Sequence, residues 1–220
     1  MSYLPFSHFH SSVPTDVQLY FWSLDETVTE LSALLPDPSL LDLPPYVNFK
    51  SVKRQQEWLA VRVLLHQVCP DTSVHIKYEE SGRPFLQPAI AEFSISHTKG
   101  MVSIALAQQS VGIDIEQCGE RPYQLRDHFL QPDEFDFSSV SHPETAALFM
   151  WSAKESVYKL VDLPGTELKA DIRLHSQGGD ARYMEFTASV TNVTRSILVR
   201  CYQMDGFVLT IATYTDKVNL

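Results

Sequence analysis

The spacing of apolar residues predicts several helices and short strands in the first half of the chain. Between Ser51 and Val68 apolar residues recur every three or four positions, which is the spacing of an amphipathic helix, and a proline just beyond predicts its end. Shorter patterns predict a helix at Asp25–Leu35 and strands at Val17–Trp22, Val74–Tyr78, Glu92–Ser96 and Met101–Ala107. The last two strands flank residues 97–100, which predict a four-residue hairpin turn.

The second half of the chain opens with an alternating segment and closes with a series of strands. Residues Val111–Glu116 predict a strand, residues 122–137 predict short helical pieces, and Pro143–Val161 predicts a long helix. Further strands are predicted at Lys169–His175, Arg182–Val190, Ile197–Gln203 and Phe207–Tyr214, with turns at Gly178-Gly179 and Asp205-Gly206. Each half therefore runs from a strand through helices to strands. This order predicts an α+β fold of two similar modules, residues 1–110 and 111–220.

Composition and charge narrow the classes of function. The 220 residues are 44% hydrophobic and 20% charged, which is typical of a globular protein of one domain or two small ones. Lys and Arg number 17 against 27 Asp and Glu, and this net charge of -10 argues against a nucleic-acid partner, because such proteins need a basic face. No apolar run is long enough to span a membrane, and the first residues lack the pattern of a secretory signal. We therefore expect a cytoplasmic protein without a membrane partner.

The three cysteines, Cys69, Cys118 and Cys201, do not have the spacing of a zinc or redox motif. We expect them to be buried, reduced thiols.

Two carboxylates alternate with isoleucines in the predicted strand Val111–Glu116. Asp114 and Glu116 project from one face, because successive side chains of a strand point to opposite sides, and Ile113 and Ile115 point into a core. Adjacent carboxylates repel each other unless water or a cation lies between them. The pattern leaves two interpretations, an edge strand with a solvated polar face or a cation site.

The long helix carries a second group of polar residues. Glu155 and Lys159 are four positions apart and share a face, which in an isolated helix indicates only a surface ion pair. Trp151 and Tyr158 on the same helix are expected in the core.

Basic residues upstream form a third group. His97 follows a predicted strand, and Gly82-Arg83-Pro84 predicts a turn that presents one guanidinium. Lys50, Lys53, Arg54 and Arg62 accompany the first long helix, where such residues usually form a solvated face.

Taken together and in this order, the motifs resemble those of the surfactin-synthetase-activating (Sfp-like) group of 4′-phosphopantetheinyl transferases. The strand motif V-G-I-D of that family corresponds to Val111–Asp114, and its helix motif W-S-x-K-E-S-x-x-K corresponds to Trp151–Lys159. Gly82-Arg83-Pro84 resembles the family's turn, and Phe93–His97 resembles its F-S-I-S-H segment. The resemblance extends from residue 50 to residue 162.

The resemblance implies two α/β modules related by a pseudo-twofold axis, with coenzyme A in the cleft between them and a monomeric (pseudodimeric) protein. It implies transfer of the 4′-phosphopantetheine arm of coenzyme A to a serine of an apo carrier protein, with release of adenosine 3′,5′-bisphosphate. This is holo-[acyl-carrier-protein] synthase activity. Acyl, polyketide and peptidyl carriers of fatty-acid, polyketide or nonribosomal peptide biosynthesis all stay open as substrates, as does the use of acyl-coenzyme A.

The resemblance also implies roles for individual residues. Asp114, Glu116 and Glu155 would hold Mg²⁺, with Mn²⁺ as an alternative. Glu155 would be the general base, directly or through a metal-bound water, and Lys159 would hold a phosphate oxygen; Asp114 completes the catalytic group. The residues expected to bind coenzyme A are Arg54, Arg62, Arg83, Ser96, His97, Lys154 and Lys159. For Lys154 a phosphate-binding and a site-supporting role both stay open.

Two other functions compete with a transferase. A metal-dependent nuclease also uses acidic clusters beside a lysine, but the acidic net charge and the lack of a long basic stripe argue against it. A non-catalytic module that binds coenzyme A or a carrier protein would bind without turnover.

Overall fold

The computed structural model describes residues 13–42, 44–180 and 182–215 and has a mixed α+β fold with antiparallel sheets. The chain divides into two compact units. Unit 1 comprises the described residues up to Glu79 together with Pro84–Gln108, and unit 2 comprises Glu80–Arg83 and the described residues from Gln109 onward. The pseudo-twofold relation and the exact module boundary inferred from the sequence stay predictions.

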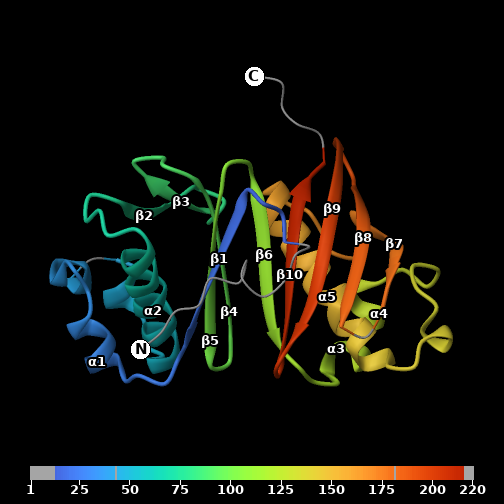
Figure 1. Cartoon of the computed structure of the whole chain (residues 1–220), viewed down its shortest axis with the longest axis horizontal. Helices are drawn as coiled ribbons and strands as arrows, with labels where there is room; N and C mark the ends of the chain where they lie inside the picture. The colour runs from blue at the N-terminus through green and yellow to red at the C-terminus, as the bar shows by residue number, and fades with distance from the viewer. Residues whose placement is uncertain (1–12, 43, 181, 216–220) are drawn as a thin grey trace. The chain divides into compact units, whose positions relative to one another are not determined.

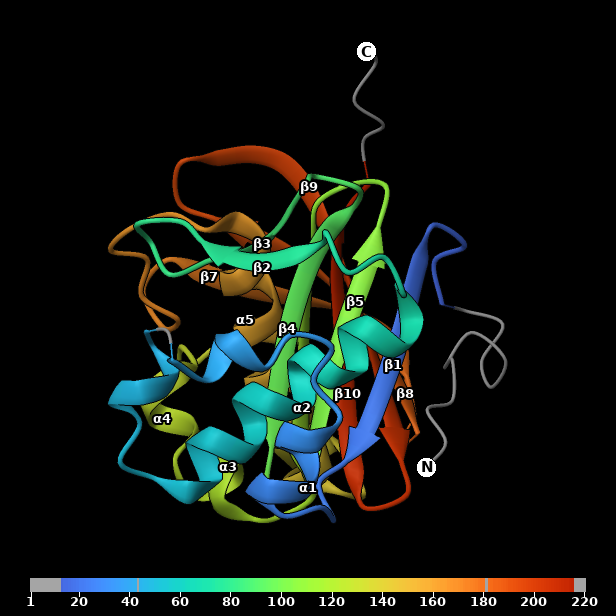
Figure 2. The same ribbon diagram turned by 90° about the vertical axis from the view of Figure 1, so that its left-hand side faces the viewer.

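Unit 1 is built on a three-stranded antiparallel sheet with the order β1-β5-β4. The sheet consists of β1 (Val17–Ser23), β5 (Met101–Ala107) and β4 (Glu92–Thr98), and α2 (Val52–Val68) packs across it (Figure 2). The other elements are α1 (Val28–Ala33), the 3-10 helices η2 (Pro38–Asp42) and η3 (Tyr46–Asn48), and a hairpin of β2 (His75–Tyr78) and β3 (Pro84–Gln87).

The long helix predicted in unit 1 is present, but it is more deeply buried than its pattern indicates. The sequence predicts one apolar stripe, whereas every residue from Glu57 to Leu65 is buried, including the charged Glu57 and Arg62. The reason is that side chains of the β2–β3 hairpin and of segment 34–49 join those of the sheet in a single core around the helix. Two ionisable groups are thereby held inside the unit.

The hairpin between β4 and β5 is tighter than predicted. Thr98 pairs with Met101, so the turn consists of Lys99 and Gly100 alone, and Gly100 has a φ of 83°. The prediction of a four-residue turn is wrong, because glycine adopts this left-handed conformation without strain and closes the turn in two residues. His97 consequently lies within β4, opposite Val102.

Unit 2 is a five-stranded antiparallel sheet with the order β6-β10-β9-β8-β7. Its strands are β6 (Val111–Gln117), β7 (Ile172–Gly179), β8 (Tyr183–Val190), β9 (Val193–Met204) and β10 (Phe207–Tyr214). The helix α5 (Pro143–Val161) covers one face of this sheet (Figure 1). The short helices α3 (Arg121–Gln124), α4 (Arg126–Phe129) and η4 (Phe137–Ser139) precede it. The strand and helix segments predicted from residue 111 onward are confirmed, with shifts of a few residues at their ends.

The two glycine turns predicted in unit 2 have different outcomes. Asp205-Gly206 is a two-residue turn between paired Met204 and Phe207, as predicted. Gly178 and Gly179 are not a turn: both lie in β7, opposite Glu185 and Met184, beyond a register shift at Ser176/Gly178. Their φ angles of 120° and 138° explain why glycine occurs at this irregularity.

Two sequence expectations concern the chain as a whole. No helix in the described ranges is both long and apolar enough to cross a membrane. All three cysteines are free thiols, but only Cys201 is buried, while Cys69 is half-buried and Cys118 is exposed. The expectation of three buried thiols is therefore wrong for two of them.

Candidate functional site

The face of β6 that carries the two carboxylates lies against α5. Asp114 and Glu116 each accept a hydrogen bond from an α5 side chain, while Ile113 and Ile115 are fully buried. The alternation predicted from the sequence is therefore confirmed. The interpretation as a solvated polar face is wrong for Asp114, whose exposed fraction is 5%.

A glycine allows the strand and the helix to approach each other closely. A Cβ atom at Gly112 would lie 2.0 Å from the Ser156 carbonyl oxygen and 2.7 Å from the Leu160 backbone nitrogen. Because both are backbone atoms of α5, any side chain at this position would push helix and strand apart. Gly112 thus sets the distance at which the side chains of α5 meet Asp114 and Glu116.

Asp114 is held by two side chains of α5. Lys159 Nζ donates to its Oδ1 at 2.8 Å and also to the Ile113 carbonyl oxygen at 3.0 Å. Ser152 Oγ donates to Oδ2 at 2.8 Å. The hydroxyl of Thr210, the β10 residue paired with Asp114, donates to the Ser152 carbonyl oxygen at 2.8 Å. The carboxylate is therefore fixed in one orientation from both sides.

Glu116 is held by an indole. Trp151 Nε1 donates to its Oε1 at 2.9 Å, and the Trp151 ring packs edge-on against Phe129 with 5.2 Å between centroids. Trp151 is half-buried. Tyr158 is 42% exposed, so the expectation that it lies in the core is wrong. The sequence analysis assigned no role to Ser152 or Trp151. They precede Glu155 by three and four residues, and this spacing indicates that they lie on the same face of the helix as Glu155.

Glu155 completes this group from the helix side. Burial raises the pKa of Glu155, and the negative charges of Asp114 and Glu116 raise this pKa further, while Lys159 acts in the opposite direction. Three carboxylates thus influence one another across the β6–α5 interface. Such a carboxylate holds a proton more readily than one in water, which suits a group that must accept one.

The same carboxylates are the candidate metal ligands. Their oxygens are the donors that Mg²⁺ prefers, and a divalent cation would offset the mutual repulsion that raises the pKa of Glu155. The donor chemistry therefore fits the ion. Within residues 13–42, 44–180 and 182–215, however, no three His, Cys, Asp or Glu side chains are grouped closely enough to hold a metal. Separate partners hold Asp114 and Glu116, and the metal role of the trio stays a prediction.

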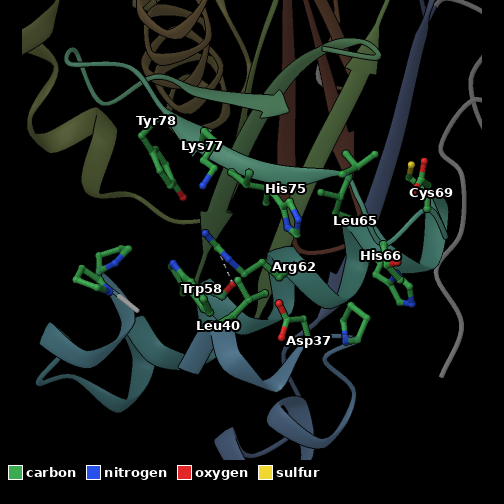
Figure 3. A pocket seen from close by; sticks show the side chains of 17 residues that line it. Asp37, Leu40, Trp58, Arg62, Leu65, His66, Cys69, His75, Lys77 and Tyr78 are labelled. Carbon is green, nitrogen blue, oxygen red and sulfur yellow. Dashed lines mark hydrogen bonds between the residues drawn. The ribbon is translucent and has the colours of Figure 1, made fainter. Parts of the chain in front are cut away.

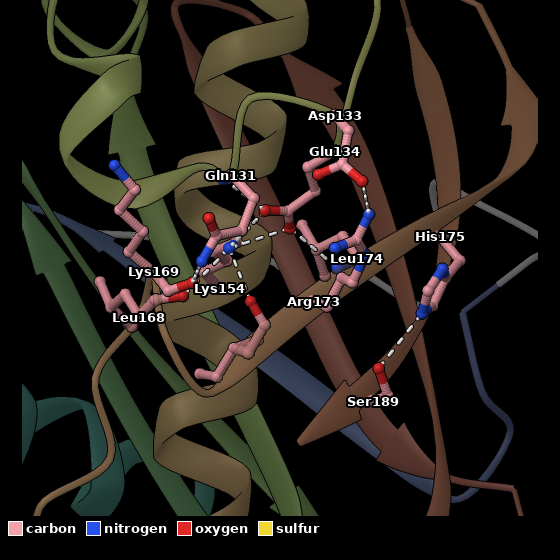
Figure 4. Close-up of polar contacts among 11 residues, drawn as sticks. Gln131, Asp133, Glu134, Lys154, Leu168, Lys169, Arg173, Leu174, His175 and Ser189 are labelled. Atoms are coloured by element: carbon pink, nitrogen blue, oxygen red, sulfur yellow. Dashed lines mark hydrogen bonds and ion pairs between the residues drawn. The ribbon is translucent and has the colours of Figure 1, made fainter. Parts of the chain in front are cut away.

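Lys154 points to the other side of α5, into a buried network (Figure 4). Its Nζ is fully buried and donates to Glu134 at 2.9 Å, to the Leu168 carbonyl oxygen at 3.0 Å and to the Ile172 carbonyl oxygen at 2.6 Å. Burial lowers the pKa of Lys154, while Glu134 acts in the opposite direction. All three donors of the ammonium are used, so the geometry supports the site-supporting role for Lys154 and gives no support to phosphate binding.

Glu134 ties this network to the edge of the sheet. It also accepts hydrogen bonds from the backbone nitrogens of Gln131 and Leu174, and its neighbour Asp133 pairs with Arg173 (Figure 4). The network therefore joins α5, the segment after α4 and β7.

In unit 1, Arg54 and His97 lie next to each other. Arg54 Nη1 is 2.9 Å from His97 Nε2, and the same nitrogen donates to Glu57 Oε2 at 3.1 Å. Lys53 Nζ lies 3.5 Å from Glu57 Oε1, and His97 Nδ1 lies 3.6 Å from that oxygen. Ser96, the other predicted ligand on β4, is 3% exposed. Two of the predicted phosphate-binding residues, Arg54 and His97, are thus neighbours.

Arg62 lines a cavity of about 520 Å³ in the same unit, between α2 and β2 (Figure 3). Its guanidinium lies 3.4 Å from the centroid of the Trp58 ring and donates to the Trp58 carbonyl oxygen at 3.2 Å. Burial lowers the pKa of Arg62, and a hydrogen bond with Tyr78 acts in the opposite direction. Lys77 also lines the cavity, as do Asp37 and Asp71, so its lining carries charges of both signs.

Arg83 lies in the connection between β2 and β3, where Gly82 has a φ of 90°. The predicted turn is therefore confirmed at Gly82 and Arg83, whereas Pro84 is already the first residue of β3. The Arg83 backbone nitrogen donates to Ser81 Oγ at 3.3 Å, and Ser81 Oγ donates to Asp162 Oδ2 at 3.1 Å. Asp162 is the C-cap residue of α5. The tip of this turn is therefore bonded to the end of the helix that carries Glu155 and Lys159.

Comparison with known proteins agrees with the motifs. Residues 110–212, which include β6, α5 and most of the five-stranded sheet, match the 4′-phosphopantetheinyl transferase superfamily. The chain is 31% identical over 122 residues to the 4′-phosphopantetheinyl transferase gsp of Aneurinibacillus migulanus, a match that covers 53% of this chain. The chain spans about half of that relative, 51% of its length.

Proposed function

We propose that the protein transfers the 4′-phosphopantetheine arm of coenzyme A to a serine of an apo carrier protein, because residues 110–212 match the 4′-phosphopantetheinyl transferase superfamily. The observation that carries this proposal is that Asp114, to which Lys159 is bonded, and Glu116 lie on the face of β6 that packs against α5, the helix that carries Glu155. Carboxylates beside one lysine suit a reaction in which negative charge moves between phosphate oxygens.

The reaction needs a base and a group that stabilises charge. The carrier serine oxygen attacks the phosphorus next to the pantetheine arm, and the bond from that phosphorus to the bridging oxygen breaks. Adenosine 3′,5′-bisphosphate leaves with the bridging oxygen. Glu155 accepts the serine proton, directly or through water, which suits a carboxylate whose pKa is raised by burial and by Asp114. Lys159 contributes a positive charge one helical turn away.

Asp114, Glu116 and Glu155 would hold Mg²⁺, or Mn²⁺ in its place, and the bound ion would neutralise charge on the pyrophosphate oxygens. What the chain itself provides is a fixed orientation of Asp114 and Glu116. Ser152 and Lys159 hold Asp114, and Trp151 holds Glu116.

Basic residues support binding of the nucleotide end of coenzyme A. Arg54 in unit 1 offers a guanidinium for a phosphate, with His97 beside it as a further candidate, and Arg62 offers a guanidinium on the wall of the 520 Å³ cavity. Such a volume lies within the usual range of about 300–1,000 Å³ for small-molecule sites. Arg83 and Ser96 stay further candidates. This concentration of basic groups allows a protein of net charge -10 to bind a polyanion.

The test is intact-protein mass spectrometry of an apo acyl carrier protein after incubation with this protein, coenzyme A and Mg²⁺. We expect a mass gain of one phosphopantetheine arm, abolished by a chelator. An apo peptidyl carrier is the second substrate and separates the fatty-acid from the peptide pathway. No gain on either carrier, with coenzyme A still bound, would contradict the transferase and favour a non-catalytic binding module.

A further inference from the structure

A buried carboxylate lies beneath the basic residues on the α2 surface of unit 1. The Glu57 side chain is only 3% exposed, whereas the side chains of Lys53 and Arg54 are 62% and 53% exposed and that of His97 is 36% exposed. All three basic groups have a nitrogen within 3.6 Å of a Glu57 oxygen. One inaccessible acid is thus shared by three accessible bases on two elements, α2 and β4.

This arrangement is costly for a carboxylate. Among the described residues, Glu57 Oε1 is one of three buried side-chain polar atoms without a hydrogen bond; the others are Trp58 Nε1 and Ser103 Oγ. Oε2 accepts from Arg54 Nη1 at 3.1 Å. Burying an incompletely bonded carboxylate costs free energy of folding, so a contribution to stability does not by itself account for Glu57.

The contacts of His97 define what Glu57 orients. Arg54 Nη1 lies 2.9 Å from His97 Nε2, and because a guanidinium only donates, Nε2 accepts this hydrogen bond. The ring hydrogen is then on Nδ1, which faces Glu57 Oε1 at 3.6 Å. Glu57 therefore contacts both members of the Arg54–His97 pair, one with each oxygen.

We propose that Glu57 is the positioning residue that holds the Arg54 guanidinium, directly through Oε2 and through the neighbouring His97 ring, ready for a phosphate of coenzyme A. The inference rests on the proposed function for its ligand. Glu57 does not touch the ligand, because its carboxylate is covered. Its single negative charge leaves the group of three bases with a net positive charge, so it fixes their geometry without cancelling their attraction for an anion.

Replacing Glu57 by glutamine tests this with little change in shape. One carboxylate oxygen becomes an NH₂ donor, which must face either Arg54 or the Nδ1 hydrogen of His97, so at least one contact is lost. We expect the dissociation constant for coenzyme A, measured by calorimetry on the full chain, to rise about tenfold. Glu57→Asp keeps the negative charge but moves the carboxylate away from Arg54 and His97, because the side chain is one methylene shorter. We expect this variant to bind coenzyme A more weakly as well. Wild-type affinity in Glu57→Asp would contradict the positioning role, because the negative charge alone would then be sufficient.

The decisive comparison is a double-mutant cycle with Arg54→Ala. If Glu57 acts through Arg54, the double variant binds coenzyme A no more weakly than Arg54→Ala alone. Additive losses, or wild-type affinity in Glu57→Gln, would overturn the inference. Glu30→Gln is the matched control, because Glu30 caps α1 by bonding to Thr27 and should leave the affinity unchanged.

A second readout separates this inference from the proposed function. NMR signals of the Arg54 guanidinium and the His97 ring report whether these groups are held in the ligand-free protein. We expect distinct Arg54 Nη signals in the wild type that merge in Glu57→Gln. If the wild type does not bind coenzyme A, the transferase proposal fails, and the NMR comparison still decides the positioning role. Identical spectra in both proteins would contradict that role.

Discussion

At the scale of single residues, the candidate site depends on side chains that hold the carboxylates as much as on the carboxylates themselves. Period-two alternation was sufficient to place Asp114 and Glu116 on one face of a strand. It did not reveal that Ser152 and Trp151 donate to them, because the rotation of α5 against β6 follows from packing over the whole unit. For the same reason Lys154, adjacent to Glu155 in sequence, points into a different network.

Ser152→Ala tests whether the orientation of Asp114 matters. The change removes the donor to Asp114 Oδ2 while Lys159 still holds Oδ1, so the carboxylate gains freedom. Loss of an outer-shell partner typically costs about 10- to 100-fold in metal affinity or activity, and we expect a loss in that range in both transfer rate and Mg²⁺ dependence. Ser156→Ala is the control, since Ser156 Oγ donates to the Ala153 carbonyl oxygen of its own helix. Equal losses in the two variants would contradict the orienting role.

At the scale of elements, the sequence predicted the bounds of α5 and the existence of β6 well, because both patterns are long and regular. It did not predict the short elements β3, η2 and η3, and two further errors lie at glycines. Gly178 and Gly179 sit in an irregular strand instead of a turn, and Gly100 shortens a turn to two residues. The sequence alone does not show why a glycine is needed. Gly100 is needed for its positive φ angle, whereas Gly112 is needed for the close approach of β6 to α5.

Gly112→Ala tests the contact between β6 and α5. The new methyl would meet backbone atoms of α5 at 2.0 and 2.7 Å, which forces the two elements apart. We expect the free energy of unfolding, measured by urea denaturation, to fall by about 3 kcal/mol and transfer activity to fall with it. Gly119→Ala is the matched control, because its Cβ would meet nothing within 4 Å. A fully stable and active Gly112→Ala protein would show that the approach is not required.

Lys154→Met tests the buried network behind α5. Removal of the ammonium leaves the Glu134 carboxylate buried without its cation, and breaking such a pair typically costs about 3–5 kcal/mol of unfolding free energy. We expect Lys154→Met combined with Glu134→Gln to recover part of this loss, because the amide still accepts from backbone nitrogen. Lys169→Met, which loses one hydrogen bond to the Asp127 carbonyl, should cost only about 1 kcal/mol. A loss no larger in Lys154→Met than in this control would contradict the structural role.

At the scale of the whole molecule, net charge and local charge have opposite signs. The chain carries a net charge of -10, yet Lys53, Arg54 and His97 gather around the single carboxylate of Glu57. The sequence identified Arg54, Arg62 and His97 only through resemblance to a family. The sequence could not show that Arg54 is exposed whereas Arg62, eight positions further along α2, is buried.

The salt dependence of coenzyme A binding checks this electrostatic account. Salt screens attraction between exposed charges, with a Debye length of about 10 Å at 0.1 M and about 3 Å at 1 M. We therefore expect the dissociation constant for coenzyme A to rise severalfold between these concentrations. Pantetheine, which lacks the phosphates, is the control and should show no such rise. Salt-independent binding of coenzyme A would exclude a basic site for its phosphates.

The most direct test of the central claim is the transfer rate of Glu155→Gln, measured by mass spectrometry of an apo carrier protein with coenzyme A and Mg²⁺. The amide keeps the size of the side chain but cannot accept the serine proton, and general bases contribute about 10²- to 10⁴-fold to a rate. We predict a loss of at least about 100-fold, with circular dichroism and thermal unfolding close to wild type. Full activity in a folded Glu155→Gln protein would contradict the assignment of the base and of the site across β6 and α5.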